Sequence, residues 1–144
     1  KLAAEARVEQ AGVPWSILRA TQFHTLIDMQ LRALLRFPLG LVPTDFRFQP
    51  IDPGEVADRL TEYAAEGAAG RLPDLGGPEV QTLGELARAW AEIRGLRRRV
   101  VRLPLPGNVA AGFRQGFNTT PEGKYGQVTW ADWVRGRYGP RSQA

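Results

Sequence analysis

The sequence predicts an α/β fold, because stretches with helical spacing of apolar residues alternate with short β-prone runs along the whole chain. Two helix-start signatures of the type Asp-Pro-x-Glu and Thr-x-x-Glu strengthen that pattern. With 144 residues, 43% hydrophobic and 24% charged, the composition is that of one globular domain with a modest core.

The first part of the chain predicts helix, strand and helix. Residues 2–11 are rich in helix formers, and Gly12 ends that helix. Trp15–Leu18 is a short β-prone run of strand length. We expect Thr21 to cap the next helix, which shows an apolar stripe at helical spacing and ends before Pro38.

The middle of the chain predicts two short strands and then a helix. Residues 39–42 and 46–51 flank a Pro-Thr-Asp turn, and we expect these two strands to pair with each other. Asp52 is the expected N-cap of the following helix, with Pro53 at its first position and Glu55 reaching back as a capping box.

The second half repeats the alternation. Arg71–Leu75 is an expected strand weakened by its proline, and Thr82 with Glu85 predicts a capping box for a helix that ends at Gly95. A strand at 100–103 and helices at 108–117 and 129–134 complete the expected elements.

The polar corner after the strand Trp15–Leu18 is the first place to look for function. In open parallel sheets, ligands bind outside the carboxyl ends of strands, and residues 20–24 follow this end. Arg19 lies in a largely apolar run, so we expect it to pair with a carboxylate, since an unpaired buried charge is costly.

These residues also carry a resemblance. The run Gly12-Val-Pro-Trp-Ser-Ile-Leu-Arg-Ala-Thr-Gln-Phe23, followed in order by 49–58, 75–79 and 82–87, resembles the second half of an atypical short-chain dehydrogenase/reductase of the NmrA-like, NAD(P)-binding kind. The resemblance covers about residues 1–105 and implies the C-terminal half of a Rossmann-like fold, with few parallel strands and a small helical substrate-side subdomain. Residues 106–144 match loosely and are expected to form a helical C-terminal extension.

Two parts of the family pattern are missing from the sequence. The family carries a Gly-rich dinucleotide loop and a Tyr four residues before the Lys that Lys1 matches, and neither is present. Gly76-Gly77 follows no strand with a G-x-G-x-x-G continuation, so it is not a pyrophosphate cradle. We therefore expect this chain alone to be inactive and to bind no dinucleotide usefully. We also expect it to need a missing N-terminal half or to self-associate, because the unpaired N–H and C=O groups of an open strand edge readily pair with another chain.

The resemblance implies specific site residues. Lys1 would be the catalytic lysine that also binds the nicotinamide ribose, and Phe23, His24 and Gln49 would face the substrate pocket. The structural alternatives are that Phe23 belongs to the apolar core stripe of its helix and that His24 is a structural residue whose hydrogen bonds are made within the protein. With one histidine and no cysteine, we expect no metal site. The cofactor-binding residues would be Lys1, Ala20, Thr21, Gln22 and Phe23.

Two function classes follow. The first is part of an SDR-type oxidoreductase, which moves hydride between NADP(H) or NAD(H) and a small carbonyl or sugar-like substrate. The alternative is a non-catalytic, NmrA-like module that senses NAD(P) and binds a partner protein. A Tyr four residues before Lys1 in the upstream coding sequence would favour the enzyme, and an apolar residue there would favour the sensor.

Charge is distributed unevenly along the chain. Residues 1–93 hold nine basic and thirteen acidic side chains, whereas residues 94–144 hold ten basic and two acidic ones. The arginines at 94, 97, 98, 99 and 102 are either a solvated helix end or an anion site. Nucleic acid is an unlikely partner because this run lacks interleaved aromatic residues. The absence of cysteine and of any long apolar run predicts a cytoplasmic protein with no membrane segment.

Overall fold

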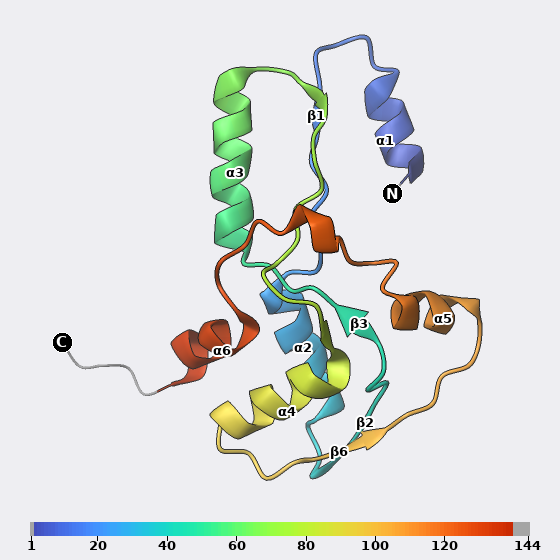
Figure 1. Ribbon diagram of the computed structural model, residues 1–144, viewed down its shortest axis with the longest axis vertical. Helices are drawn as coiled ribbons and strands as arrows, with labels where there is room; N and C mark the ends of the chain where they lie inside the picture. The colour runs from blue at the N-terminus through green and yellow to red at the C-terminus, as the bar shows by residue number, and fades with distance from the viewer. Residues whose placement is uncertain (1, 140–144) are drawn as a thin grey trace, which may run out of the picture.

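The computed structural model describes residues 2–139 and shows a mixed α/β chain (Figure 1). Helices and short strands alternate, as the sequence predicts. In chain order the elements are α1 (Leu2–Glu9), β1 (Ser16–Ile17), α2 (His24–Leu34), β2 (Leu39–Val42), β3 (Arg47–Phe48), α3 (Pro53–Glu66), β4 (Gly70–Arg71), β5 (Gln81–Thr82), α4 (Leu83–Ile93), β6 (Arg99–Arg102), α5 (Asn108–Gln115), the 3-10 turn η1 (Pro121–Gly123) and α6 (Trp130–Tyr138).

The strands form three separate pairs within the described residues. β1 pairs with β4 and β2 pairs with β6, both in parallel, whereas β3 pairs with β5 antiparallel. The expected pairing of the strands at 39–42 and 46–51 is therefore wrong. The turn after β2 instead serves the start of α4, because the N–H of Leu83 donates to the carbonyl of Phe46 at 2.7 Å and so satisfies one of the helix's free donors.

Two of the predicted helix starts are confirmed. Asp52 caps α3 by accepting from the N–H of Gly54 at 2.8 Å, and Pro53 occupies the first helical position. Thr82 and Glu85 form the complete capping box of α4.

Two other cap assignments are wrong. The N-cap of α2 is Phe23, not Thr21, and it makes no side-chain cap bond. The hydroxyl of Thr21 donates to the carbonyl of Gln49 instead. Glu55 does not close a capping box either, because its Oε1 accepts from the N–H groups of residues 127 and 128, at 2.7 and 3.2 Å. In both cases the side chain that local spacing assigns to a helix cap forms a hydrogen bond with a distant backbone group instead.

The main core lies where α2, α4, α5 and α6 meet. Its centre is formed by fully buried apolar side chains, among them Ile27, Leu31, Leu86 and Val134. Trp130 of α6 is 2% exposed, and its Nε1–H donates to a backbone carbonyl of α4 at 3.0 Å. A smaller cluster of Ile51, Val56 and Leu75 packs against the partly buried Leu18, Ala20 and Tyr125.

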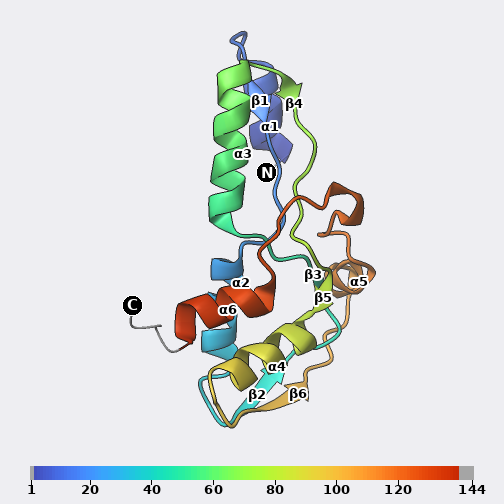
Figure 2. The ribbon, with the colours of Figure 1, turned by 60° about the vertical axis from the view of Figure 1, so that its left-hand side comes forward.

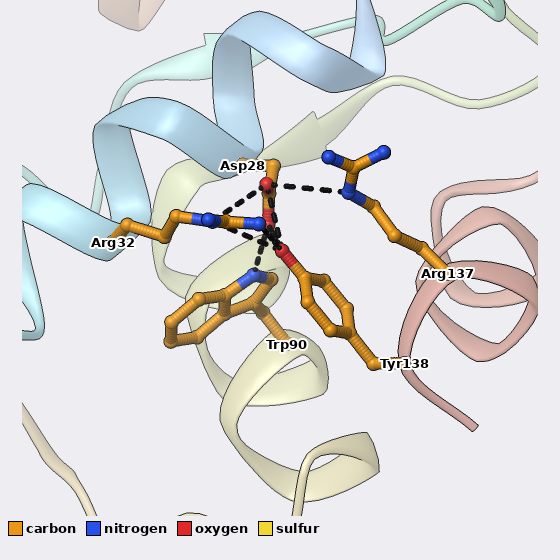
Figure 3. A network of polar contacts seen from close by, with 5 residues as sticks. All are labelled: Asp28, Arg32, Trp90, Arg137 and Tyr138. Atoms are coloured by element: carbon orange, nitrogen blue, oxygen red, sulfur yellow. Dashed lines mark hydrogen bonds and ion pairs between the residues drawn. The ribbon is translucent and has the colours of Figure 1, made fainter. Parts of the chain in front are cut away.

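A buried carboxylate fastens α6 to α2 and α4 (Figure 3). Asp28 of α2 accepts from Trp90 Nε1–H at 2.8 Å and from the Tyr138 hydroxyl at 2.7 Å. Arg32 Nε donates to the same carboxylate at 3.0 Å, and Arg137 Nε lies 3.8 Å from it. Three helices are thus joined through one side chain, which fixes the position of the last helix.

The two parallel strand pairs lie at opposite ends of the molecule (Figure 2). At one end, the β1–β4 pair lies between α1 and α3 in the view of Figure 1. This end has little core of its own: α3 buries Val56, but Leu60 of the same apolar stripe is 47% exposed. No helix of the described part is long and apolar enough to cross a membrane.

Candidate functional site

The strand β1 is paired along one edge only. Gly70 N–H donates to the carbonyl of Trp15 at 3.0 Å, and Leu72 N–H donates to that of Ile17 at 2.9 Å. In a parallel ladder, alternate residues direct their peptide groups to opposite edges, so the N–H and C=O groups of Ser16 and Leu18 face away from β4. Within residues 2–139, no other strand pairs with that outer edge.

The same alternation continues beyond the strand. Leu75 N–H donates to the carbonyl of Arg19 at 2.8 Å, and Thr21 N–H donates to the carbonyl of Leu75 at 2.9 Å. Ala20 therefore directs both its N–H and its C=O to the open edge. The carboxyl end of β1 thus presents one backbone donor and one backbone acceptor side by side.

A cleft of about 730 Å³ lies along this open edge. It is lined by residues 18–23, which follow β1 directly, and by side chains of α1, α2 and α3. The lining residues are Glu5, Leu18, Arg19, Ala20, Thr21, Gln22, Phe23, Leu26, Val56 and Leu60. The wall from α3 is apolar because the stripe of that helix, which a complete core would cover, borders the cleft instead.

An ion-pair cluster closes one side of the cleft. Arg19 forms a two-pronged contact with Glu5 of α1, at 3.0 Å from Nε and 2.6 Å from Nη2. Arg71 of β4 reaches the same carboxylate at 2.8 Å. The hydrogen bonds from Arg19 and then Arg71 lower the pKa of Glu5 to about 2. The expected carboxylate partner of Arg19 is confirmed, and the cluster holds α1 against the β1–β4 pair.

The residues from Ala20 to Phe23 all line the cleft. Thr21 and Gln22 are tied back to the protein, the latter through Nε2, which donates to the carbonyl of Asn118 at 3.1 Å. Phe23 is 38% exposed, so its ring is not part of the main core. The strand end is therefore held rigidly while its outer groups stay accessible.

His24 and Gln49 lie behind this wall and do not line the cleft. Both are fully buried. Gln49 Nε2 donates to the carbonyl of Gly77 at 2.8 Å, and its Oε1 accepts from Thr120 N–H at 2.7 Å. Gly77 has no room for a side chain, because a Cβ would collide with the carbonyl of Pro50. The Gly-Gly pair thus serves close packing.

The ring of His24 is enclosed by α6. Its Nε2 lies 3.0 Å from the carbonyl of Val128, and the rings of Trp130 and Trp133 lie 5.7 and 5.6 Å away. Burial lowers the pKa of His24 from its ordinary value of 6.5, because the charged form loses hydration. Burial therefore favours the neutral imidazole, and this ring supports the cleft wall from within.

Two further expectations concern the remaining site chemistry. Lys1, the expected catalytic lysine, lies outside the described residues. Among residues 2–139 no group of three metal-binding side chains is present. The lining residues outside the predicted set are Glu5, Leu18, Arg19, Leu26, Val56 and Leu60, and the apolar stripes of α2 and α3 were the signals available for the last three.

Comparison with known proteins identifies the fold. No protein-family model and no curated protein matches the chain. Solved structures do match, and three of them show the extent of the likeness. A nucleoside-diphosphate-sugar epimerase from Staphylococcus aureus has a TM-score of 0.66 and 13% identity, and the match covers 92% of this chain and 56% of that one. RMD from Pseudomonas aeruginosa complexed with NADPH has a TM-score of 0.57 and 17% identity over 94% of this chain and 51% of that one, and a mutant NmrA has a TM-score of 0.52 and 16% identity over 94% of this chain and 52% of that one.

The chain spans about half the length of each of these structures. At such low identity the likeness concerns the fold, and it confirms the predicted class: part of a Rossmann-like α/β fold. The unpaired edge of β1 agrees with that reading, because an internal strand of a parallel sheet has neighbours on both sides.

Proposed function

We propose that this chain is the substrate-side half of an NAD(P)-dependent protein of the short-chain dehydrogenase/reductase type, acting on a small carbonyl or sugar-like substrate. The cleft along β1 is then the half of the active site that this chain contributes. The observation that carries the proposal is the unpaired donor and acceptor of Ala20 at the carboxyl end of a parallel strand.

The chemistry of that pair suits the nicotinamide end of a dinucleotide. A primary carboxamide carries one acceptor oxygen and one donor NH₂ group, and Ala20 offers the complementary donor and acceptor to the cleft. Thr21 and Gln22 are fastened to the protein by their side chains, so the backbone is already in place. When bound, the cofactor would supply or accept hydride.

The substrate side of the cleft is formed by Phe23 and the apolar wall of α3. We assign Phe23 to direct substrate contact, and we assign His24 and Gln49 to positioning it, since both are buried behind the wall. Lys1 keeps its proposed role at the nicotinamide ribose. Its partner would be a Tyr four residues upstream, whose pKa a nearby ammonium lowers toward working pH.

The proposal also requires a second segment. The outer edge of β1 and the exposed Leu60 need a neighbouring strand and its apolar surface, and this chain contains no Gly-rich phosphate loop. A preceding segment of the same polypeptide, or a separate chain, would supply both. A non-catalytic sensing protein would use the same cleft, but no structural observation favours it.

The test uses the polypeptide extended through its upstream coding sequence, titrated with NADPH and followed by nicotinamide fluorescence. Ala20→Pro removes the outward N–H but no ladder bond, so we expect an affinity loss of about tenfold, the equivalent of one hydrogen bond. Ala20→Ser keeps the N–H and should stay near the parent value. Phe23→Ala, which removes a ring that lines the cleft next to Ala20, should also weaken NADPH binding, and Phe117→Ala, which removes a remote exposed ring, should leave it unchanged.

Two results would contradict the proposal. One is NADPH binding by the present chain alone at micromolar concentration, because no phosphate cradle is present in its sequence. The other is equal affinity of the Ala20→Pro and Ala20→Ser variants of the extended polypeptide.

A further inference from the structure

A second open strand edge lies on β6, at the end of the molecule opposite the β1–β4 pair (Figure 2). Arg99 N–H donates to the carbonyl of Pro38 at 2.9 Å, and Leu103 N–H donates to that of Val42 at 2.8 Å. By the alternation of a parallel ladder, the peptide groups of residues 100 and 102 face away from β2. No strand within residues 2–139 pairs with that outer edge.

A groove of about 310 Å³ runs beside this edge, between α4 and β6. It is lined by Arg88, Ala91, Glu92, Leu96, Arg98 and Val100. The Nε of Arg98 is buried and has no hydrogen-bond partner within the described part of the chain. A buried guanidinium donor without an acceptor is unusual, because such groups are normally paired.

The surface around the edge is strongly positive. Arg102 pairs with Asp45 at 3.0 Å, but no carboxylate of residues 2–139 forms an ion pair with Arg88, Arg98 or Arg99. Glu92 is the one acidic side chain lining the groove. The charge therefore favours an acidic occupant.

The outer face of the same sheet carries exposed apolar side chains together with Arg99, which lies on the same face as Val101. Leu41 and Val101, which are register partners on β2 and β6, are 50% and 39% exposed. A strand added to β6 would place alternate side chains over the groove and beside Val101. The site thus combines backbone pairing groups, Arg88 and Arg98 on the side of the groove, and an outer side where exposed apolar residues lie beside Arg99.

We propose that the outer edge of β6 binds an extended acidic segment of a partner protein by strand addition. Its inward side chains would be carboxylates that meet Arg88 and Arg98, and its outward ones would be apolar. Unpaired N–H and C=O groups call for a peptide and not for a lipid surface or a nucleic acid. A second copy of this chain is disfavoured because its own β6 would bring arginines opposite arginines. The proposal is independent of the function proposed for the cleft.

The test measures fluorescence anisotropy of short labelled peptides titrated with the full chain. A peptide of alternating valine and glutamate should bind, and one of alternating valine and lysine should not. A valine–glutamate peptide with alternate N-methylated amides keeps its charge but loses its pairing groups, so we expect at least about a tenfold weaker affinity.

Protein variants locate the site. Val100→Pro removes an outward N–H without removing a ladder bond, and Arg98→Gln removes the guanidinium whose Nε is buried. Each should weaken the valine–glutamate peptide about tenfold or more. Arg7→Gln makes the same charge change on exposed α1 and should leave binding unchanged. A thermal unfolding curve for each variant shows that it is folded.

Several outcomes would overturn the inference. They are no peptide binding, equal binding of the N-methylated peptide, and equal weakening by Arg7→Gln. Stronger binding of single-stranded DNA or of anionic phosphatidylserine vesicles at the same edge would also do so. If Val100→Pro fails to fold, Arg98→Gln and the N-methylated peptide still decide the matter.

Discussion

Replacing Asp28 by alanine should strongly destabilise the fold, because this carboxylate joins three helices (Figure 3). The change leaves Trp90 Nε1–H, on a side chain only 2% exposed, without its acceptor at 2.8 Å. An orphaned buried donor costs about 1–3 kcal/mol, and the charge-assisted bonds to the carboxylate add to this. Arg32 and Arg137 are half exposed and regain water, so they add little. We expect a total near 3 kcal/mol, or a decrease of roughly 10 °C in Tm.

Urea unfolding followed by tryptophan fluorescence measures this cost. Asp58→Ala, an exposed aspartate of α3, is the control and should change the free energy of unfolding by less than about 0.5 kcal/mol. On a Trp90→Phe background no donor is orphaned, so Asp28→Ala should cost about 1–2 kcal/mol less. If Asp28→Ala destabilises no more than Asp58→Ala, the carboxylate does not hold α6 in place.

Three further predictions follow from single contacts. Because burial lowers the pKa of His24 below 6.5, the unfolded chain takes up the proton first as pH falls. The free energy of unfolding should therefore decrease from pH 6.5 down through the pKa of the folded state. Urea titrations above and below pH 6.5 measure this slope, and His24→Asn should abolish it. Glu55→Ala removes the acceptor of the amides of residues 127 and 128, so their hydrogen exchange should become faster and the free energy of unfolding should decrease by about 1–2 kcal/mol. Unchanged exchange would show that the carboxylate does not anchor this segment. Gly77→Ala forces a Cβ into a backbone carbonyl and should destabilise the fold by about 1–3 kcal/mol. Gly136 of α6 has open space where a Cβ would lie, so Gly136→Ala should be neutral or stabilising. Equal Tm values for the two variants would contradict the packing argument.

Local signals in the sequence predicted the fold well where the partners are close along the chain. The Thr82–Glu85 box and the Asp52 cap span three residues or fewer, so spacing alone reveals them. Thr21 and Glu55 carry the same residue types at similar positions, but their actual partners lie 28 and 72 or more residues away. Spacing cannot reveal such a competitor, because it exists only once the chain is folded.

The candidate site was partly predictable for the same reason. The position of residues 20–23 at the end of a strand follows from order along the chain, and the structure does place them on the cleft. The α1 side chain that joins the cleft wall, Glu5, and the burial of His24 beneath α6 depend on packing between distant segments. A strand pairing such as β2 with β6 is likewise set by tertiary contacts, because it joins residues 60 positions apart.

Residue-resolved amide hydrogen exchange of β1 tests most directly whether another segment completes the cleft. In the dilute, monomeric chain, the outward amides of Ser16, Leu18 and Ala20 should exchange fast, while Thr21, which donates to Leu75, is protected. In the polypeptide extended through its upstream coding sequence, the three outward amides should become protected as well. Slow exchange of those amides in the monomeric chain alone, or no gain of protection in the extended one, would contradict the account.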